Sequence, residues 1–354
     1  MKRIKNYRLK AETLSPVHVG DGSEIEPLEY VIETDFYKLN LAEFLTSLSS
    51  EDQLYLMKLQ QKAEDLTKIR QFIKDRFTPE NEYYIEWRSK VTESVQTIYL
   101  EKLDQPENQL KVSPFIRTAD KPYLPGSSIK GAFRTALLNS WSRNIDKHKD
   151  NTKAQNIEAE IYGGLRERRD RPGSYYADIS SDPFRALKVR DIFLPDESTV
   201  FSKVSNFNIK DDKLNETNIQ IICEVTTCPL SFELEIGIDE ELFKIRESGL
   251  KKVISLKDLL EVTNNFYIKI LHSEKARLFD GRAEKIAEIY KKIEDAGKGG
   301  YLLRLGWGSG FESMTIEKFR QPALPEKIKG GWGFSKHLVE EKFPLGWVKL
   351  ILEG

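Results

Sequence analysis

The chain has 354 residues, of which 39% are hydrophobic and 31% are charged; this length is about twice that of a usual domain, so two domains are expected. Its 55 basic and 56 acidic residues nearly cancel. This excludes a whole-protein field that would attract nucleic acid, and any such binding must come from local patches. With two cysteines and four scattered histidines, the sequence argues against a structural metal site.

The sequence carries no pattern for export or membrane insertion. Its N-terminal segment is charged, with Lys2, Arg3 and Lys5, and no apolar stretch follows, so a signal peptide is not expected. No stretch approaches the apolar length that a bilayer requires. Cys223 and Cys228 are expected to be reduced strand residues. We therefore expect a cytoplasmic protein with no cofactor and no membrane partner.

The first third of the chain predicts strands interrupted by helices. Residues 4–13 alternate between apolar and charged side chains, which is typical of a half-buried strand. Residues 16–22 are rich in turn formers and predict a loop, and residues 30–33 predict a second strand. Residues 39–77 are highly charged and contain neither Gly nor Pro, which favours a helical insertion. Strand-like patterns follow at residues 83–91 and 94–100.

The middle of the chain begins with a helix and then becomes rich in strands. The segment PYLPGSS (residues 122–128) breaks the pattern, and an amphipathic stripe follows it. The stripe contains Ile129, Ala132, Phe133, Ala136, Leu137 and Trp141. Further strands are predicted at residues 189–193, 199–204, 219–225 and 231–238.

The last third predicts two helices and two short strands. Ser255 and Asp258 form a helix start signal, and a second helix at residues 282–296 is expected to use Gly297 as its C-cap. Strands are predicted at residues 301–305 and 346–352. Because strands and helices mix without a strict βαβ rhythm, the α+β class is favoured over a doubly wound sheet.

The turn before the first long helix is a candidate phosphate site. Gly126 and Gly131 are spaced as in a P-loop, but Ala132 and Phe133 stand where Lys and Ser/Thr are required, which excludes nucleotide hydrolysis by that route. Free N–H groups near Ser127 and Ser128 would still bind an anion.

Two cations on this helix bear on the same question. The helix dipole disfavours Lys130 in the first turn, and a bound anion would remove that conflict. Arg134, four residues on, lies beside it. The alternative is a buried helix with two ordinary cations whose heads reach solvent.

A glycine-rich segment near the C-terminus is the second candidate. Gly306, Gly308 and Gly310 alternate with other residues after a predicted strand, which permits positive φ and close approach by another backbone. Arg304 adds positive charge, and Trp307 would stack on a base or enter the core. A tight connection between two strands is the alternative for this segment.

The third candidate is a basic loop, GGLRERRDRPG (residues 163–173). The loop contains four arginines, Arg166, Arg168, Arg169 and Arg171, and only two acidic residues. It therefore either contacts phosphates or is a solvated charged loop. Residues for catalysis are few. His18 is the one reasonable general base in its loop, and Asp191 has no marked metal partner.

Three segments together resemble motifs of one protein family. Residues 14–22 (LSPVHVGDG) resemble the opening loop of the RAMP superfamily of CRISPR-associated proteins. Residues 123–134 (YLPGSSIKGAFR) resemble its central signature, and residues 303–311 (LRLGWGSGF) resemble its C-terminal Gly-rich loop. The last segment, with PLGW at residues 344–347, is similar to the fifth Csm subunit of type III-A complexes.

The resemblance implies a fold of two RRM-like (ferredoxin-like) modules. The N-terminal module would span residues 1–190, with the helical insertion near 39–77. The C-terminal module would span residues 191–354, with the Gly-rich loop at 306–310. A β-hairpin thumb that intrudes between guide and target would lie within residues 196–222.

The resemblance also implies a subunit without a catalytic centre that caps the 3′ end of guide RNA. Its partners would be guide and target RNA, the neighbouring RAMP backbone subunit and trimming nucleases. The implied RNA-binding residues are Ser127, Ser128, Lys130, Arg134, Arg166, Arg168, Arg169, Arg304, Gly306, Gly308 and Gly310. Two alternatives stay open: a metal-independent RAMP endoribonuclease that processes guide RNA with His18 as base, and a RAMP subunit at another position of a related type III complex.

Overall fold

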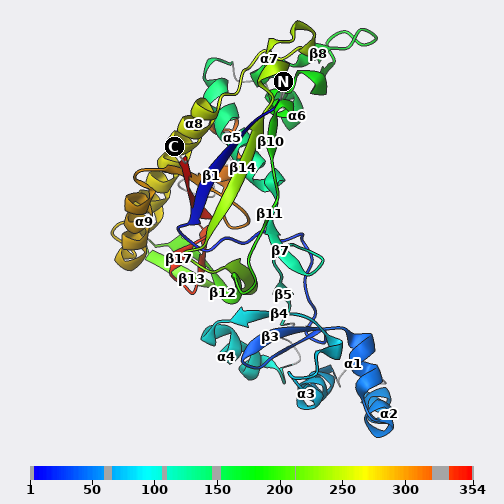
Figure 1. The fold of residues 1–354 in the computed structure, drawn as a ribbon. Coiled ribbons are helices and arrows are strands. Elements are labelled where there is room, and N and C mark those ends of the chain that lie inside the picture. The colour runs from blue at the N-terminus through cyan, green and yellow to red at the C-terminus, as the bar shows by residue number, and fades with distance from the viewer. Residues whose placement is uncertain are drawn as a thin grey trace.

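A computed structural model describes residues 4–59, 66–105, 110–145, 153–211, 213–320 and 335–352. These residues form two large sheets with helices around them (Figure 1), which confirms the predicted α+β class. The β8–β9 hairpin lies at one end of the molecule and helices α1–α3 lie at the other. Among the described helices, none is long and apolar enough to cross a membrane.

The first sheet has five antiparallel strands in the order β10-β14-β1-β18-β15. Its central strand confirms the alternation in the sequence, because Leu9 and Ala11 are buried whereas Arg8 and Lys10 are exposed. The strands are β1 (Lys5–Thr13), β10 (Leu187–Val189), β14 (Ser231–Ile238), β15 (Tyr301–Arg304) and β18 (Trp347–Leu352).

The chain order β1-α5-β10-β14-α8-β18 and the spatial order of these strands are those of a ferredoxin-like module, with β15 as an extra edge strand. Helix α5 (Gly126–Trp141) buries the predicted apolar stripe. Helix α8 (Leu256–Glu274) begins as predicted, because the Ser255 hydroxyl accepts a hydrogen bond from the Asp258 amide at 3.1 Å.

The second sheet has the order β17-β16-β12-β4-β3-β2, and β13 also pairs with β12. Both sheets combine strands from before and after residue 190, so they do not divide at the predicted domain boundary. The strands are β2 (Tyr30–Ile32), β3 (Asp35–Leu39), β4 (Ile85–Val91), β5 (Val112–Ser113), β12 (Thr199–Lys210), β13 (Lys213–Thr226), β16 (Ser335–Val339) and β17 (Phe343–Pro344). Strands β12 and β13 form a long antiparallel hairpin where the thumb is predicted.

The predicted insertion is helical and lies between the paired strands β3 and β4. It consists of α1 (Leu41–Ser47), α2 (Ser50–Leu59) and α3 (Leu66–Arg76), while residues 60–65 of the predicted segment lie outside the described part. Its core joins Phe44 and Ile73 to Tyr37 and Tyr84.

Two predictions for local structure were wrong. Residues 94–100 form a helix, α4 (Glu93–Lys102), instead of a strand, because Val95 and Tyr99 lie one turn apart and both are buried. Gly297 is not the C-cap that follows the helix; it is the last residue of the helix itself, α9 (Glu284–Gly297), and Lys298 is the C-cap. A side chain there would press on Leu302, so close packing requires this glycine.

Short elements complete the described fold. The small strands are β6 (Arg117–Thr118), β7 (Lys121–Leu124), β8 (Leu165–Glu167), β9 (Tyr175–Ala177) and β11 (Ile192–Phe193). The short helices are α6 (Ala154–Tyr162), α7 (Glu240–Lys244), the π-helix η7 (Lys275–Phe279) and the 3-10 turns η2 (Glu82–Tyr84), η3 (Ser142–Asn144), η4 (Ile179–Ser181), η5 (Pro183–Ala186), η6 (Arg246–Ser248), η8 (Phe311–Met314) and η9 (Glu317–Phe319).

Candidate nucleic-acid interface

Two of the three sequence motifs are in direct contact. The loop at residues 14–22 lies against the Gly-rich loop at residues 306–310, and the Trp307 amide donates to the His18 carbonyl at 2.8 Å. The same loop meets the start of β18, where the Gly346 amide donates to the Pro16 carbonyl at 2.8 Å. Motifs almost 300 residues apart in sequence therefore build one surface.

The glycines of the Gly-rich loop have the conformation that the sequence predicts. Gly306, Gly308 and Gly310 have φ values of 76°, 74° and 88°, in the region that favours glycine. A Cβ atom on Gly306 would overlap the carbonyl oxygen of His18. The prediction of positive φ and close approach by another backbone is confirmed.

His18 occupies a structural position under this surface. It is 5% exposed, its Nδ1 lies 2.6 Å from the Glu224 carbonyl oxygen, and its ring packs edge-on against Phe115 and Trp307. Burial lowers the pKa of His18, although the Glu224 carbonyl opposes that shift. A buried imidazole whose Nδ1 is already engaged is poorly placed to take a proton from RNA.

Glu224 supports the same loop, and the sequence reasoning missed it. This fully buried carboxylate pairs with both terminal nitrogens of Arg117, at 2.5 Å each, and accepts from the Thr199 hydroxyl at 2.6 Å. The Arg117 guanidinium lies 3.7 Å from the centre of the Trp87 ring. The available signal was a single acid inside the apolar run at residues 219–225, since a buried charge requires a partner.

The predicted anion site at the start of α5 already contains an anion from the protein. The Asp191 carboxylate accepts from the Gly126 amide at 2.7 Å, which satisfies the first N–H group of the helix. Ser127 is exposed and Ser128 is half-buried. Lys130 is half-buried and directs its Nζ to the Leu187 carbonyl at 2.9 Å. An external phosphate is thus not needed to resolve the conflict with the helix dipole.

Arg134 is engaged by two carboxylates. Its Nη2 lies 2.6 Å from Glu158 and its Nη1 lies 2.8 Å from Asp182. The guanidinium also lies 4.6 Å from the centre of the Phe184 ring. Because these partners come from two other segments, α6 and the turn that begins at Asp182, Arg134 holds α5 to its neighbours, and contact with RNA would have to compete with two ion pairs.

The predicted basic loop is the β8–β9 hairpin. Arg166 points inward and donates to the Gly163 carbonyl at 3.1 Å and to the Ser181 hydroxyl at 3.1 Å. Arg168, Arg169 and Arg171 are exposed, and no carboxylate of a described residue forms an ion pair with them. The structure thus separates one structural arginine from three that remain accessible.

The prediction that Arg304 contacts RNA has to be corrected. Arg304 is 2% exposed, donates through Nε to the Leu345 carbonyl at 2.9 Å, and lies over the Trp347 ring. A guanidinium enclosed on all sides cannot reach a ligand. Its position at the end of β15, directly before the Gly-rich loop, gives it a supporting role instead.

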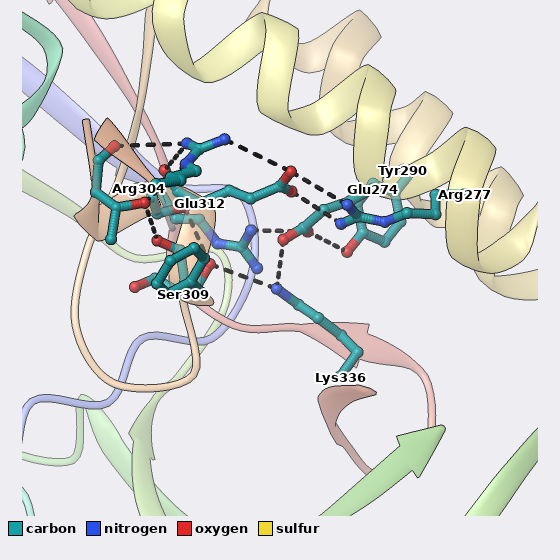
Figure 2. Close-up of polar contacts among 11 residues, drawn as sticks. Glu274, Arg277, Tyr290, Arg304, Ser309, Glu312 and Lys336 are labelled. Carbon is teal, nitrogen blue, oxygen red and sulfur yellow. Dashed lines mark hydrogen bonds and ion pairs between the residues drawn. The ribbon is translucent and has the colours of Figure 1, made fainter. Parts of the chain in front are cut away.

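Arg304 belongs to a buried ionic cluster, which we call the Glu274 cluster: Glu274, Tyr290, Arg304 and Lys336. Figure 2 shows the Glu274 carboxylate between the two cations, with Arg304 Nη1 at 2.7 Å and Lys336 Nζ at 2.7 Å. The Tyr290 hydroxyl donates to the same carboxylate at 2.9 Å. Although burial alone raises the pKa of Glu274, the two cations lower it to about 2.

A second ion pair fixes the segment that follows the Gly-rich loop. Glu312 in η8 pairs with Arg277 in η7 at 2.8 Å, next to the Glu274 cluster (Figure 2). The Ser309 carbonyl accepts from Lys336 at 3.4 Å and from the Ser313 hydroxyl at 3.0 Å. The Gly-rich loop is therefore fixed by two sets of contacts. Lys336 and the Glu312–Arg277 ion pair hold its C-terminal part, and the His18 loop holds Trp307.

The described residues contain no group of three or more His, Cys, Asp or Glu side chains that could hold a metal ion. Cys223 is buried in β13 as expected, whereas Cys228 is exposed and follows the strand. Burial raises the pKa of the Cys223 thiol to about 12.

Comparison with known proteins relates these motifs to named relatives. A protein from Methanocaldococcus jannaschii named CRISPR system Cms protein Csm5 is 26% identical over 328 residues, covering 89% of this chain and 74% of that protein. A protein of the same name from Streptococcus thermophilus is 29% identical over 146 residues, covering 38% of this chain and 39% of that protein.

Two solved structures have the same fold. A chain in the cryo-EM structure of a Csm-crRNA-target RNA ternary complex of a type III-A CRISPR-Cas system matches with a TM-score of 0.75 at 20% identity, covering 98% of this chain and all of that one. The crystal structure of T. onnurineus Csm5 matches with a TM-score of 0.62 at 20% identity, covering 96% and 99%. The family model described as the RAMP superfamily matches residues 10–312. The chain therefore belongs to the RAMP superfamily, as its three motifs predict.

Proposed function

We propose that the chain is a non-catalytic RNA-binding subunit of a type III-A CRISPR interference complex, where it caps the 3′ end of the guide RNA. In this role it also supports guide maturation by helping to recruit trimming nucleases. Its partners are guide and target RNA and the neighbouring RAMP backbone subunit. Two relatives named Csm5 and a structural neighbour from a Csm-crRNA-target RNA complex support this assignment.

The observation that carries the proposal is an exposed tryptophan on the Gly-rich loop. The Trp307 side chain is 39% exposed, and its ring contacts the rings of His18 and His337, whose centres lie 5.9 and 4.6 Å away. Gly20 and Gly22 are exposed on the adjoining loop. An aromatic ring held in place stacks on an unpaired base, and glycine backbone lets a phosphate approach closely.

The other residues predicted to contact RNA fall into two groups, those that are accessible to solvent and those that are enclosed by the protein. We propose Arg168 and Arg169 as phosphate contacts, together with Ser127 and Ser128 near the start of α5, because these side chains are not enclosed. Phosphate contacts give binding that is sensitive to salt and nearly independent of sequence. The remaining cations that the sequence predicts as contacts instead support the fold that positions these accessible residues: Lys130, Arg134, Arg166 and Arg304.

Omitting this chain from a co-expressed complex should change the 3′ ends of the bound guide RNA. Sequencing of guides purified with and without the chain measures this directly. Trp307→Leu should reproduce part of the effect, because leucine fills space but cannot stack on a base, whereas Trp307→Phe should retain most of the wild-type pattern.

Identical 3′ ends with and without the chain would refute the cap. A change confined to guide occupancy would favour a RAMP subunit at another position of the complex. Each protein preparation should contain the same ratio of the other subunits, so that a lost end effect is not mistaken for lost assembly.

Incubation of the purified chain with precursor guide RNA and a chelator should yield no cleavage, because His18 is buried. If cleavage occurs, the variant His18→Asn decides its origin. Asparagine keeps an N–H group that can reach the Glu224 carbonyl but has no imidazole base. Cleavage that is lost in His18→Asn would establish the endoribonuclease alternative instead.

A further inference from the structure

We propose that Lys336 is a positioning residue that ties the Gly-rich loop to the sheet carrying the β12–β13 hairpin. Its buried ammonium group would add to the contacts through the His18 loop, which joins the Gly-rich loop to β13, and fix the two parts in one relative arrangement. The proposal rests on the proposed function only in so far as that function makes both parts contact RNA. The mechanical connection itself can be tested without RNA.

One end of the connection is the contact with the Gly-rich loop. Lys336 is 4% exposed, and its Nζ donates to Glu274 Oε1 at 2.7 Å and to the Ser309 carbonyl at 3.4 Å. A Cβ atom on Gly310 would lie 3.1 Å from this Nζ. The loop therefore approaches the ammonium group closely at two successive residues.

The other end is the main chain of β16. Lys336 lies opposite Phe207 of β12, within a register that extends from Val204↔Val339 to Asn208↔Ser335. Strand β12 is one arm of the β12–β13 hairpin. The backbone of Lys336 is thus part of the hairpin's sheet, while its side chain crosses to the Gly-rich loop (Figure 2).

Charge balance does not explain why a lysine stands here. Arg304 alone neutralises Glu274, so the Glu274 cluster contains one cation in excess. A buried charge carries a desolvation cost, and apolar residues of similar volume often serve stability equally well. Lys336 carries this desolvation cost although it is not needed to neutralise Glu274. A role in fixing the position of the Gly-rich loop would account for it.

The protonation state of Lys336 gives the connection a pH dependence. The charged or titratable groups around it are Glu274, Tyr290, Arg304, Glu312 and the neighbouring His337. Burial and repulsion by Arg304 lower the pKa of Lys336 to about 8, against the attraction of Glu274. Above that pH the ammonium group becomes an amine, and its hydrogen bond to Ser309 loses the assistance of the charge.

Hydrogen–deuterium exchange on the full chain without RNA tests the connection. At pH 7, Lys336→Met should raise exchange about tenfold or more in residues 306–313 and 204–210, as expected for loss of a charge-assisted bond. Exchange in β1 and α5 should not change. Lys349→Met is the matched control, because Lys349 is also shielded but pairs with Glu12 instead of the loop.

Raising the pH from 7 to 9 provides a second test. It uses the wild type and Lys336→Arg, so it remains informative if Lys336→Met does not fold. After correction for intrinsic exchange, the wild type should lose protection in both segments with a midpoint near pH 8, whereas Lys336→Arg should keep it because arginine stays charged. Equal protection in Lys336→Met and wild type, or a pH response that Lys336→Arg retains, would overturn the proposal. If both segments loosen but guide 3′ ends stay unchanged, the connection stands and the proposed function fails.

Discussion

Replacing Glu274 by Gln should lower the free energy of unfolding by about 3–5 kcal/mol, because two buried cations lose their shared carboxylate. Arg304 and Lys336 both lie 2.7 Å from that carboxylate, and Tyr290 also donates to it. Neither cation can reach water, so neither can recover its solvation. Urea denaturation of the purified chain measures the loss.

The control for this variant lies on the same helix. Glu261 is half exposed and pairs with Lys257 at 3.9 Å, so Glu261→Gln should change stability by no more than about 0.5 kcal/mol. Replacing Glu274, Arg304 and Lys336 together by apolar residues should recover most of the stability. A Glu274→Gln variant within experimental error of the wild type would contradict the buried cluster.

Acid titration provides an independent check on Glu274. Its pKa is lowered from 4.5 to about 2 in the folded protein, so its contribution is present above pH 4.5 and is lost as the pH falls toward 2. That difference corresponds to about 3 kcal/mol. Between pH 5 and pH 2.5 the wild type should therefore lose more stability than Glu274→Gln does.

Replacing Gly306 by Ala should destabilise the chain by about 2–4 kcal/mol, the sum of a left-handed backbone strain and a steric overlap. The new Cβ would overlap the backbone carbonyl of His18, which cannot rotate away as a side chain would. The substitution should therefore push the Gly-rich loop away from the loop at residues 14–22. Urea denaturation measures the stability, and guide 3′-end sequencing measures the consequence for the proposed cap.

Two other glycines allow the backbone strain and the steric overlap to be measured separately. Gly281 has a φ of 72° with nothing within 4 Å of an added Cβ, so Gly281→Ala should cost only the backbone strain, about 1 kcal/mol. Gly131 lies inside α5 with open space around it, so Gly131→Ala should stabilise by about 0.5–1 kcal/mol. If Gly306→Ala costs no more than Gly281→Ala, the two motif loops do not meet as described.

The local elements were largely predictable because their signals are local. The alternation in β1, the stripe of α5 and the Ser255 cap each depend on residues within one turn or strand. The exception, α4, has β-branched and aromatic residues that also suit a strand. Its helical state follows from burial of Val95 and Tyr99 beside Phe201, a residue about 100 positions away.

The sequence by itself determined the positive φ of Gly306, Gly308 and Gly310, because only glycine adopts that backbone freely. It also determined the family, through three short motifs whose order survives low overall identity. It could not say which cations are accessible. Arg304 and Arg168 look alike in the sequence, yet one is enclosed by Glu274 and Trp347 and the other is exposed.

Only the tertiary structure decided which charges pair with each other. Asp191 caps α5, Glu158 and Asp182 bind Arg134, and Lys336 reaches the loop at Ser309. These partners lie 24 to 65 residues apart in the chain. Electrostatic energy depends on distance in space and on burial, and neither quantity is encoded in sequence spacing. The sequence therefore predicted which segments are rich in charge. The tertiary structure shows which of these charges are paired inside the protein and which stay exposed to contact a binding partner.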